Sequence, residues 1–513
     1  MYSSSLSLET GYEQLSPKNA QKRRPNASKP KRNTTNKRLL LDQVNESLIN
    51  QLYTLPRQKV CQSCMSFTDA FLDAGTFKSS VSLHSGSSST LLNSAPSTDT
   101  VSCNSSTITN RYPNIDSLDL DKLASPSPSE PKQAKHSDVF TLDDFTSTET
   151  IKKLATRYGR VSHMGMLDRS YSFFVNKKRT GALSFKVQNK VAIVTGDPLC
   201  DPDLFTELLA EFEEYRKGRH YGIAYLGASE IFAHYAKQRS WTTLEFGKER
   251  VLNPMTNDVL LERSGKRIVV QNKQLLCREK GGIAIGLYVP RRGEDPDLQQ
   301  ELVAIYDAWR LRRNQTSSTQ AFITVYDPFS LPDMMTYLYT RGPDGAANGF
   351  AALRKVGANE GYHIDPCIAA PGAPRGISDL LVFAAMAFLN HGGVSYLSLG
   401  FEPLDNLGET TGMSRPLENF TRALHRRTFR RLPVEGKKAY HDKFRPDKSQ
   451  ESSLYLIFPT GVLSPRAVVA MAHMANISIR KIVLAEERSS RNKHSQAKQD
   501  QIRGGSQETR DRG

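Results

Sequence analysis

The amino-acid sequence predicts a mixed α/β fold, built from two consecutive units of similar order with a disordered extension in front. Strand-like and helix-like patterns alternate twice through the middle of the chain. The N-terminal part is instead rich in Ser, Thr, Asn and Pro, a composition that buries too little apolar surface to offset chain entropy. The predicted division is a disordered tail over 1–137, a first domain over 138–257, a second domain over 258–485 and a polar disordered tail over 486–513.

Composition limits the classes of partner. The chain has 513 residues, 38% of them hydrophobic, with a formal net charge of +16 and a pI near 9.4. This charge suits nucleic acid or an anionic membrane surface and does not choose between them. No stretch has the roughly 18 uninterrupted apolar residues of a spanning helix, and the N-terminus lacks the apolar segment of a signal peptide. The expected location is therefore the cytoplasm, with peripheral association with membranes.

The six cysteines show no spacing typical of a disulfide framework, which predicts reduced thiols. Cys61 and Cys64 form a lone CxxC pair, more often a coincidence than a zinc site, so no bound metal is expected. The basic run Lys18–Arg38 is interpreted as a solvated tail, with a nuclear localisation signal or an RNA or phospholipid contact as alternatives. Leu39–Leu55 has helical periodicity and predicts a short partner-binding helix.

The first unit is expected to begin near residue 142 with a helix that ends at Tyr158. A hairpin over 183–187 and 190–195 leads into Gly196-Asp197-Pro198. Apolar residues at helical spacing predict a helix over 201–217, whose acidic first turn suits a helix N-terminus. A strand over 222–226 and a helix over 229–238 complete the unit.

The second unit repeats this order with more strands. Its predicted helices cover 297–313, with Leu302, Ile305, Tyr306 and Trp309 on one side, then 380–389 and 465–484. The predicted strands cover 268–270, 283–288, 321–326, 336–339, 349–355, 362–364, 394–399 and 454–458. The similar order of the two units suggests duplication, although no internal identity proves it.

The segment from Asp365 to Leu404 carries the charges of most interest. Asp365 opens a small-residue loop, Arg375 and Asp379 flank the start of an apolar helix, and Glu402 follows the next strand. Either Ser378 or Asp379 is expected to cap this helix. Each charge taken singly has a local explanation, but together the four are expected to converge at one end of a rigid strand-loop-helix-strand unit.

Beyond Leu404 the chain becomes basic. Between Arg422 and Arg445 nine Lys or Arg residues stand against Glu435 and Asp442, interleaved with Phe429, Tyr440 and Phe444. Cations with aromatic rings suit a single-stranded RNA end, because phosphates pair with the charges and unstacked bases lie on the rings. A solvated basic helix face is the alternative.

These motifs, in this order, resemble the C-terminal domain of lysylphosphatidylglycerol synthases, the multiple peptide resistance factor family. The resemblance covers roughly residues 150–480 and rests on the Asp365 loop, Gly376 with Asp379, Gly196-Asp197-Pro198, Leu399-Gly400-Phe401-Glu402-Pro403-Leu404 and Lys443-Phe444-Arg445-Pro446. It implies tandem domains of the GCN5-related N-acetyltransferase type, with the active site in the second domain and a cleft that admits the aminoacyl end of a tRNA.

The resemblance also assigns site residues. The expected catalytic residues are Asp365, Asp379, Glu402 and Arg375. The expected substrate-binding residues are Gly196, Asp197, Trp309, Gly376, Gly400, Arg430, Lys438, Lys443 and Phe444. No cofactor is expected besides the charged tRNA as co-substrate, because the pyrophosphate-binding motif of acetyl-CoA users fails after Arg278-x-x-Gly281 and after Arg354-x-x-Gly357. In bacterial relatives an arginine follows the loop aspartate closely, where this chain has Cys367 and Ile368.

Free-standing chains with a long Ser-rich extension resemble the filamentous fungal members of the family. This resemblance implies transfer of glycine from glycyl-tRNA to the 3β-hydroxyl of ergosterol at a membrane surface, for which the amphipathic helix over 465–484 is a candidate contact. One alternative is an aminoacyl-phosphatidylglycerol synthase with a lysyl or alanyl donor. The other is a non-catalytic protein of this fold that binds RNA or membranes. The oligomeric state stays open.

Overall fold

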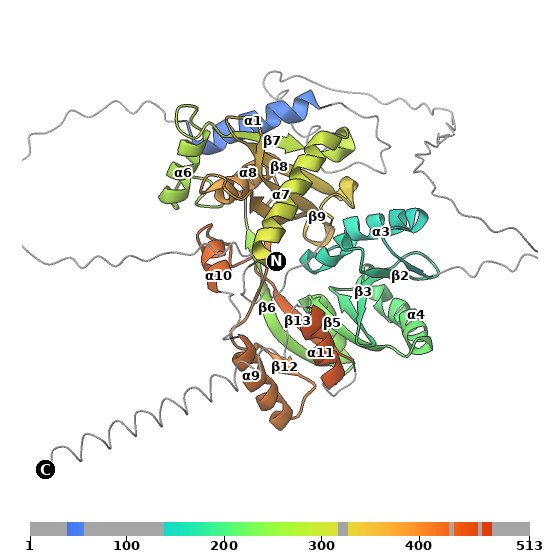
Figure 1. Ribbon diagram of the computed structural model, residues 1–513. Coiled ribbons are helices and arrows are strands. Elements are labelled where there is room, and N and C mark those ends of the chain that lie inside the picture. The colour runs from blue at the N-terminus through green and yellow to red at the C-terminus, as the bar shows by residue number, and fades with distance from the viewer. Residues whose placement is uncertain (1–37, 56–137, 316–326, 430–434, 460–463, 475–513) are drawn as a thin grey trace, which may run out of the picture. The chain divides into compact units, whose positions relative to one another are not determined.

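The computed structural model describes residues 38–55, 138–315, 327–429, 435–459 and 464–474 (Figure 1). Within these residues thirteen strands form one mixed sheet, in the order β1-β2-β3-β4-β5-β13-β6-β11-β10-β9-β8-β7, with β12 paired to β6. The β4–β5 and β10–β11 pairs are parallel and the other pairs are antiparallel. Strands from both predicted domains therefore belong to one sheet, and the domain boundaries stay predictions.

The strands are β1 Val139–Phe140, β2 Ser172–Val175, β3 Ala182–Gln188, β4 Val191–Thr195, β5 Gly222–Ala228, β6 Thr242–Leu252, β7 Ala284–Tyr288, β8 Met335–Arg341, β9 Ala347–Val356, β10 Gly361–Ala369, β11 Leu397–Pro403, β12 Thr410–Thr411 and β13 Ser453–Phe458. The α-helices are α1 Leu40–Thr54, α3 Phe145–Tyr158, α4 Phe205–Gly218, α5 Glu230–Gln238, α6 Lys266–Leu276, α7 Pro296–Asn314, α8 Ile377–His391, α9 Arg415–Phe429, α10 Glu435–Asp442 and α11 Pro465–Met474. Short 3-10 helices include η2 Val161–Leu167 and η6 Gly357–Asn359.

Most predicted elements are confirmed with small shifts of their ends. The predicted strand over 268–270 is wrong, because these residues lie in α6. Ile268, Val269, Asn272 and Leu275 are buried along one face of that helix, so packing outweighs the strand preference of the β-branched run. The strand predicted over 321–326 lies outside the described residues.

The strand β11 continues further than the sequence predicts. Gly400 was expected to begin a closing turn, but it lies inside β11 with φ +92°, where the register against β6 shifts between Ser398 and Phe401. Glycine adopts this backbone conformation without steric cost, so the bulge is absorbed and the strand goes on. Glu402 and Pro403 remain paired with β6, and the position of Glu402 is fixed by the sheet.

The helix α8 is the buried centre of the second half. Residues 380–389 are at most 1% exposed, as the unbroken apolar run predicts, and α8 packs on β8, β9 and β10. Its N-cap is Gly376 with φ +99°, without a side-chain cap. The prediction that Ser378 or Asp379 caps α8 is therefore wrong, because both residues lie in the first turn, where their side chains are available for other contacts.

The helix predicted over 39–55 is confirmed as α1, and it packs inside this chain rather than only against a partner. Leu40, Leu48 and Leu52 are at most 1% exposed, and α1 contacts α8 and β7. The Gln51 side chain bonds the edge strand β7 twice, with Nε2 donating to the Ile285 carbonyl oxygen at 2.9 Å and Oε1 accepting from the Leu287 N–H at 2.9 Å. One side-chain amide thus satisfies backbone groups of the sheet edge.

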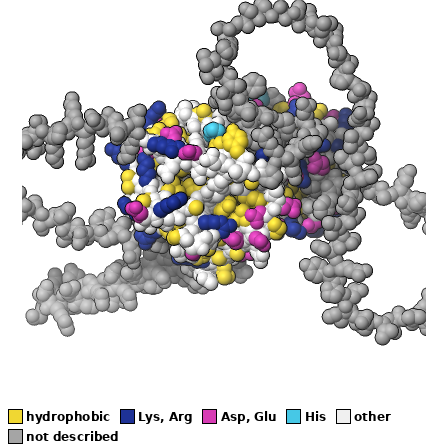
Figure 2. Space-filling model, turned by 90° about the horizontal axis from the view of Figure 1, so that it is seen from above, with side chains coloured by type: hydrophobic (Ala, Val, Ile, Leu, Met, Phe, Trp, Pro, Cys, Tyr) yellow, Lys and Arg dark blue, Asp and Glu magenta, His cyan; other side chains and the backbone are white. Residues whose placement is uncertain are grey.

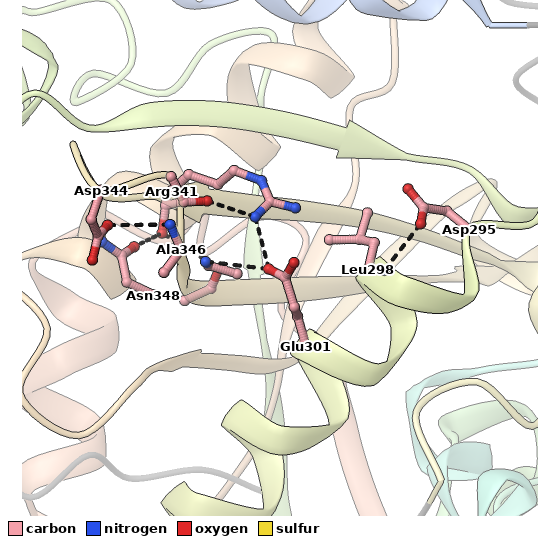
Figure 3. Close-up of polar contacts among 11 residues, drawn as sticks. Asp295, Leu298, Glu301, Arg341, Asp344, Ala346 and Asn348 are labelled. Carbon is pink, nitrogen blue, oxygen red and sulfur yellow. Dashed lines mark hydrogen bonds and ion pairs between the residues drawn. The ribbon is translucent and has the colours of Figure 1, made fainter.

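The helix α7 is fastened to the β8–β9 hairpin, as Figure 3 shows. Glu301 on α7 accepts from Arg341 Nη1 at 2.8 Å and from the Ala347 N–H at 3.3 Å. At its start, Asp295 caps α7 by accepting from the Leu298 N–H at 3.0 Å. These contacts fix the helix whose apolar side lies on the core around Tyr337 and Phe350.

The described part of the C-terminal helix packs on the sheet. Ala467, Ala470 and Met471 of α11 are buried in one cluster with Ile193 and Leu244. This apolar face is therefore not available to a membrane, and residues 475–484 of the predicted helix lie outside the described residues. On the face seen in Figure 2, Lys and Arg side chains lie among acidic and hydrophobic ones, so the net positive charge forms no continuous basic surface on that face.

Candidate functional site

Asp365 lies in β10, at a cis peptide bond to Pro366 and at a register shift against β9 between Ile364 and Cys367. Its side chain is buried, with 6% exposed. His363, two residues earlier, is also buried, as are its neighbours Tyr362 and Ile364, so both faces of this part of β10 are covered. Burial lowers the pKa of His363, and the positive charges of Arg354 and Lys437 lower it further, so this ring is neutral.

Lys437 brings a buried cation to the same place. It lies in α10 with 7% of its surface exposed, and its Nζ donates to the Phe401 carbonyl oxygen at 3.0 Å. Burial lowers the pKa of Lys437 to about 8, while Asp365 and Glu402 act in the opposite direction. An added Cβ at Gly400 would lie 3.5 Å from His363 Nε2 and 3.7 Å from Lys437 Nζ, so Gly400 borders both groups.

Glu402 lies beside a second set of buried groups. Its Oε2 is 3.5 Å from Arg250 Nε and 3.8 Å from His441 Nδ1. Burial would raise the pKa of Glu402, but His441 and Arg250 outweigh it and lower that pKa below its usual value. Burial lowers the pKa of His441 to about 4, so Glu402 is a carboxylate beside a neutral imidazole.

Arg250 connects Glu402 to more acidic residues. Its guanidinium also pairs with Asp442 and, at 2.7 Å, with Glu451. A planar guanidinium holds several carboxylates in fixed directions. Arg250 therefore fixes the end of α10 and the position of Glu402 together.

Asp379 forms an ion pair with Lys443. The Lys443 Nζ to Asp379 Oδ1 distance is 2.5 Å, and the same ammonium lies 3.9 Å from the centre of the Tyr440 ring. Cys367 donates to the Ser378 carbonyl oxygen at 3.5 Å. Burial raises the pKa of the Cys367 thiol, and the charges of Asp379 and Asp365 raise it further. Both carboxylates are thus close enough to Cys367 to act on it, and the thiol is protonated.

Three of the four expected catalytic residues therefore lie in one region, since Asp365 and Glu402 both act on Lys437 and Asp365 and Asp379 both act on Cys367. The helix α10 and the residue that follows it face all three through Lys437, His441 and Lys443. Arg375 is placed differently, because its side chain is exposed and its carbonyl oxygen accepts from Gln271 Nε2 at 2.8 Å. Gly376 lies against the same Gln271 side chain.

Of the expected substrate-binding residues, some lie near the site carboxylates and others pack in or against the core. Lys438 is exposed and contributes to the lowered pKa of Glu402, and Lys443 is half-buried at the site. The Phe444 ring is fully buried and offers no face to a nucleotide base in this structure. Trp309 packs on the core beside Tyr306, and Arg430 lies outside the described residues.

Gly196 and Asp197 hold the first half of the sheet together. Asp197 is buried, pairs with Arg160 at 3.0 Å, and accepts from the Ser229 N–H at 2.7 Å and the Ser229 hydroxyl at 2.5 Å. A Cβ at Gly196 would meet the His163 ring at 2.7 Å. These contacts join η2, the end of β4 and the start of α5, and the substrate-binding role of both residues stays a prediction.

Sequence reasoning missed His363, Lys437 and His441 as site residues. For His363 the signal was its two-residue spacing from Asp365 in a strand. For Lys437 and His441 the sequence carried no signal, because the pattern of a basic segment does not distinguish its buried residues from its exposed ones. In the described part of the chain, no three His, Cys, Asp or Glu side chains are placed to hold a metal ion, and no helix is long and apolar enough to span a membrane.

Comparisons with known proteins place this arrangement in a family. A sequence profile of the family described as "Phosphatidylglycerol lysyltransferase, C-terminal" matches residues 152–456. The chain is 24% identical over 255 residues to a protein named lysylphosphatidylglycerol biosynthesis bifunctional protein LysX from Mycolicibacterium gilvum, covering 49% of this chain and 22% of that protein. A protein of the same name from Rhodococcus jostii is 23% identical over 257 residues, again covering 49% of this chain and 22% of that protein.

Two solved structures share the fold. One is the C-terminal domain of a protein described as a lysylphosphatidylglycerol synthetase from Agrobacterium fabrum, with a TM-score of 0.50, 19% identity, and coverage of 64% of this chain and 96% of that one. The other is L-PGS from Bacillus licheniformis, with a TM-score of 0.50, 17% identity, and coverage of 64% and 95%. These matches confirm the predicted mixed α/β fold.

Proposed function

The chain belongs to the family of phosphatidylglycerol lysyltransferase C-terminal domains, and on this premise we propose that it is an aminoacyltransferase that moves an amino acid from a charged tRNA to a lipid hydroxyl. The observation that carries the proposal is the buried carboxylate Asp365, whose charge acts on Lys437 together with that of Glu402 and on Cys367 together with that of Asp379. A site of this kind suits a substrate that carries its own ammonium group.

The proposed reaction exchanges one ester for another. The lipid hydroxyl attacks the carbonyl carbon of the aminoacyl ester, the bond to the tRNA 3′-terminal ribose oxygen breaks, and the proton of the attacking hydroxyl ends on that oxygen. An activated ester needs no ATP or metal for this step, and no cofactor besides the charged tRNA is proposed. The protein must supply position, proton transfer and stabilisation of the tetrahedral oxyanion.

Each side chain is proposed for one part of this task. Asp365 receives the α-ammonium of the amino acid, because a buried carboxylate pairs strongly with a positive charge. Lys437 keeps the neighbouring groups as carboxylates through its positive charge. Arg375, exposed at the start of α8, contacts a phosphate near the tRNA 3′ end, and Lys438 does the same from α10.

For the finer identity we propose glycine as the amino acid and the 3β-hydroxyl of ergosterol as the acceptor, with a cytoplasmic enzyme peripherally associated with the membrane. The support is the resemblance to fungal members of the family with a Ser-rich N-terminal extension and the replacement of the expected arginine near Asp365 by Cys367 and Ile368. The alternative acceptor is phosphatidylglycerol, which the names of the bacterial relatives favour. The chain spans only about a fifth of the length of those relatives, 22% in both cases.

The deciding experiment follows radiolabel into extracted lipid. The purified chain is incubated with tRNA charged separately with labelled glycine, aspartate, lysine or alanine, and with vesicles that contain ergosterol or phosphatidylglycerol. Glycine label in a sterol band, abolished by ribonuclease, is the expected result. Label in phosphatidylglycerol would replace the sterol proposal, and folded protein that labels neither lipid would refute transfer to both.

A matched pair of variants ties the activity to the site. Asp365→Asn removes the buried charge with little change of shape, and transfer is expected to fall by roughly 100-fold or more. Asp344→Asn makes the same chemical change at an exposed turn and should leave transfer unchanged. Full transfer by Asp365→Asn would remove Asp365 from the proposed mechanism.

A further inference from the structure

The helix α9 is amphipathic in the opposite sense to a normal surface helix, because its polar face lies on the protein. Arg422 donates to the carbonyl oxygens of Leu407 and Gly408 and to the Thr410 hydroxyl, and it pairs with Glu418 at 2.8 Å. One turn further, His425 Nε2 bonds the Leu404 carbonyl oxygen at 2.8 Å. Glu418, Arg422 and His425 follow each other at helical spacing, so one polar stripe anchors the helix.

The outward face of α9 is apolar. Phe420 is 64% exposed and Leu424 is 43% exposed, and they lie one turn apart on the side away from Arg422. The exposed residues Pro416 and Ala423 extend this face. Other exposed large hydrophobic side chains of the described chain, such as Val187, Ile231 and Leu311, lie singly on separate elements.

Basic residues border the apolar face. Arg427 is exposed at the C-terminal end of this face, one turn beyond Leu424, and Arg415 and Arg426 are exposed between the face and the anchored polar stripe, in a chain whose net charge is +16. A helix with exposed aromatic and aliphatic side chains between arginines has the chemistry of helices that lie in the surface of an anionic bilayer. An RNA surface would use aromatic rings and cations, but it has no use for the exposed aliphatic Leu424.

We infer that the outward face of α9, formed by Pro416, Phe420, Ala423 and Leu424, docks on an anionic bilayer surface with Phe420 and Leu424 inserted among the lipids. The position of α9 in the chain relates this docking to the candidate site. The helix follows β11, which carries Glu402, and precedes α10, which carries Lys437 (Figure 1). Docking through α9 would hold the site near the headgroups, where the hydroxyl of a lipid acceptor lies. Only this relation rests on the proposed function, since the docking itself needs no transfer.

The test measures binding of the full chain to vesicles without tRNA or amino acid. The vesicles contain phosphatidylcholine alone or mixed with phosphatidylglycerol, and bound protein is measured by co-sedimentation. The double variant Phe420→Glu/Leu424→Glu is expected to bind the mixed vesicles about tenfold more weakly or worse. The control Ile231→Glu changes an equally accessible hydrophobic side chain, 48% exposed in the first turn of α5, and should bind as the unmodified chain does.

A second readout locates the helix directly. Phe420→Trp places a fluorophore on the outward face, and brominated lipids in the vesicles are expected to quench it, whereas Ile231→Trp should add no quenchable signal. Unchanged vesicle binding by the double variant would overturn the inference. The inference would also be overturned if the double variant lost binding to uncharged tRNA but still bound vesicles as the unmodified chain does. In that case α9 would be an RNA-binding surface. If the unmodified chain transfers no amino acid yet docks through α9, the proposed function fails and this inference stands.

Discussion

Lys437 is a buried cation whose nearest charges are two carboxylates of the candidate site. Burial of an ammonium costs folding free energy, and a methionine of similar volume would avoid that cost but would leave the two carboxylates without their cation. The pKa of about 8 shows that the neighbouring carboxylates do not fully compensate the burial. The burial of Lys437 is therefore interpreted through the charges of the candidate site.

Lys437→Met is expected to lower transfer by roughly 100-fold and also to lower the thermal unfolding midpoint, because removal of one partner leaves buried carboxylates without their cation. The reason is that the ionised carboxylates at the site lose a neighbouring positive charge. The acidic limb of the pH profile of kcat/KM should consequently move to higher pH, an effect that a purely structural residue would not produce. Lys448→Met, at an exposed lysine, is the control. An unmoved pH profile would contradict this role.

Between elements, an ion pair joins α8 to the residue that follows α10. Lys443 Nζ lies 2.5 Å from Asp379 Oδ1, with side-chain exposures of 30% and 13%. A double-mutant cycle with Asp379→Asn and Lys443→Met should give a coupling of about 1 kcal/mol in the free energy of unfolding. The exposed pair Glu149 and Lys153, 3.9 Å apart, should give roughly 0.3 kcal/mol or less in the same experiment. Equal coupling energies for the two pairs would mean that the Asp379–Lys443 pair stabilises the fold no more than an exposed ion pair does.

The helix α1 is part of the folded unit, although the sequence around it predicts disorder. Leu48 is fully buried against this unit, so Leu48→Ala should lower the free energy of unfolding by about 2–4 kcal/mol. Tyr53→Ala, at a side chain that is 47% exposed, should change it by less than about 0.5 kcal/mol. Urea unfolding measures both values. A loss for Leu48→Ala no larger than that for Tyr53→Ala would mean that α1 contributes little to the fold.

Some helices and strands could be predicted from the sequence and others could not. The helices α4 and α7 were predictable from apolar residues at helical spacing, and α8 from an apolar run that is too long for a typical strand. The start of α8 was not, since Gly376, Ser378 and Asp379 all suit a helix start, and the positive φ at Gly376 decides between them. The charges of Asp365, Asp379 and Glu402 were predicted to converge from their places at strand and helix ends. The groups that tune them, Lys437 and His441, come from α10, and sequence spacing does not reveal the tertiary contact that buries them.

On the scale of the whole molecule, several histidines are buried as neutral rings. Burial lowers the pKa of His163 and of His441 to about 4, and it lowers the pKa of His363 as well. His163 uses its neutral form directly, because Nδ1 accepts from the Arg160 N–H at 3.0 Å while Nε2 bonds the Asp197 carbonyl oxygen at 2.9 Å. Protonation at Nδ1 would break the first of these bonds.

The folded protein should therefore lose stability as the pH falls. Between about pH 6.5 and 4 the unfolded chain binds protons at these histidines and the folded chain does not, so the free energy of unfolding falls by roughly 1.4 kcal/mol per pH unit for each one. The raised pKa of Glu249, caused by its burial, opposes this trend. His163→Asn keeps an acceptor for the Arg160 N–H and removes the titration, so urea unfolding of this variant at several pH values should show a shallower dependence by about the slope of one histidine. His220→Asn, at an exposed histidine, should keep the original slope. An unchanged slope for His163→Asn would mean that this ring also binds its proton in the folded state.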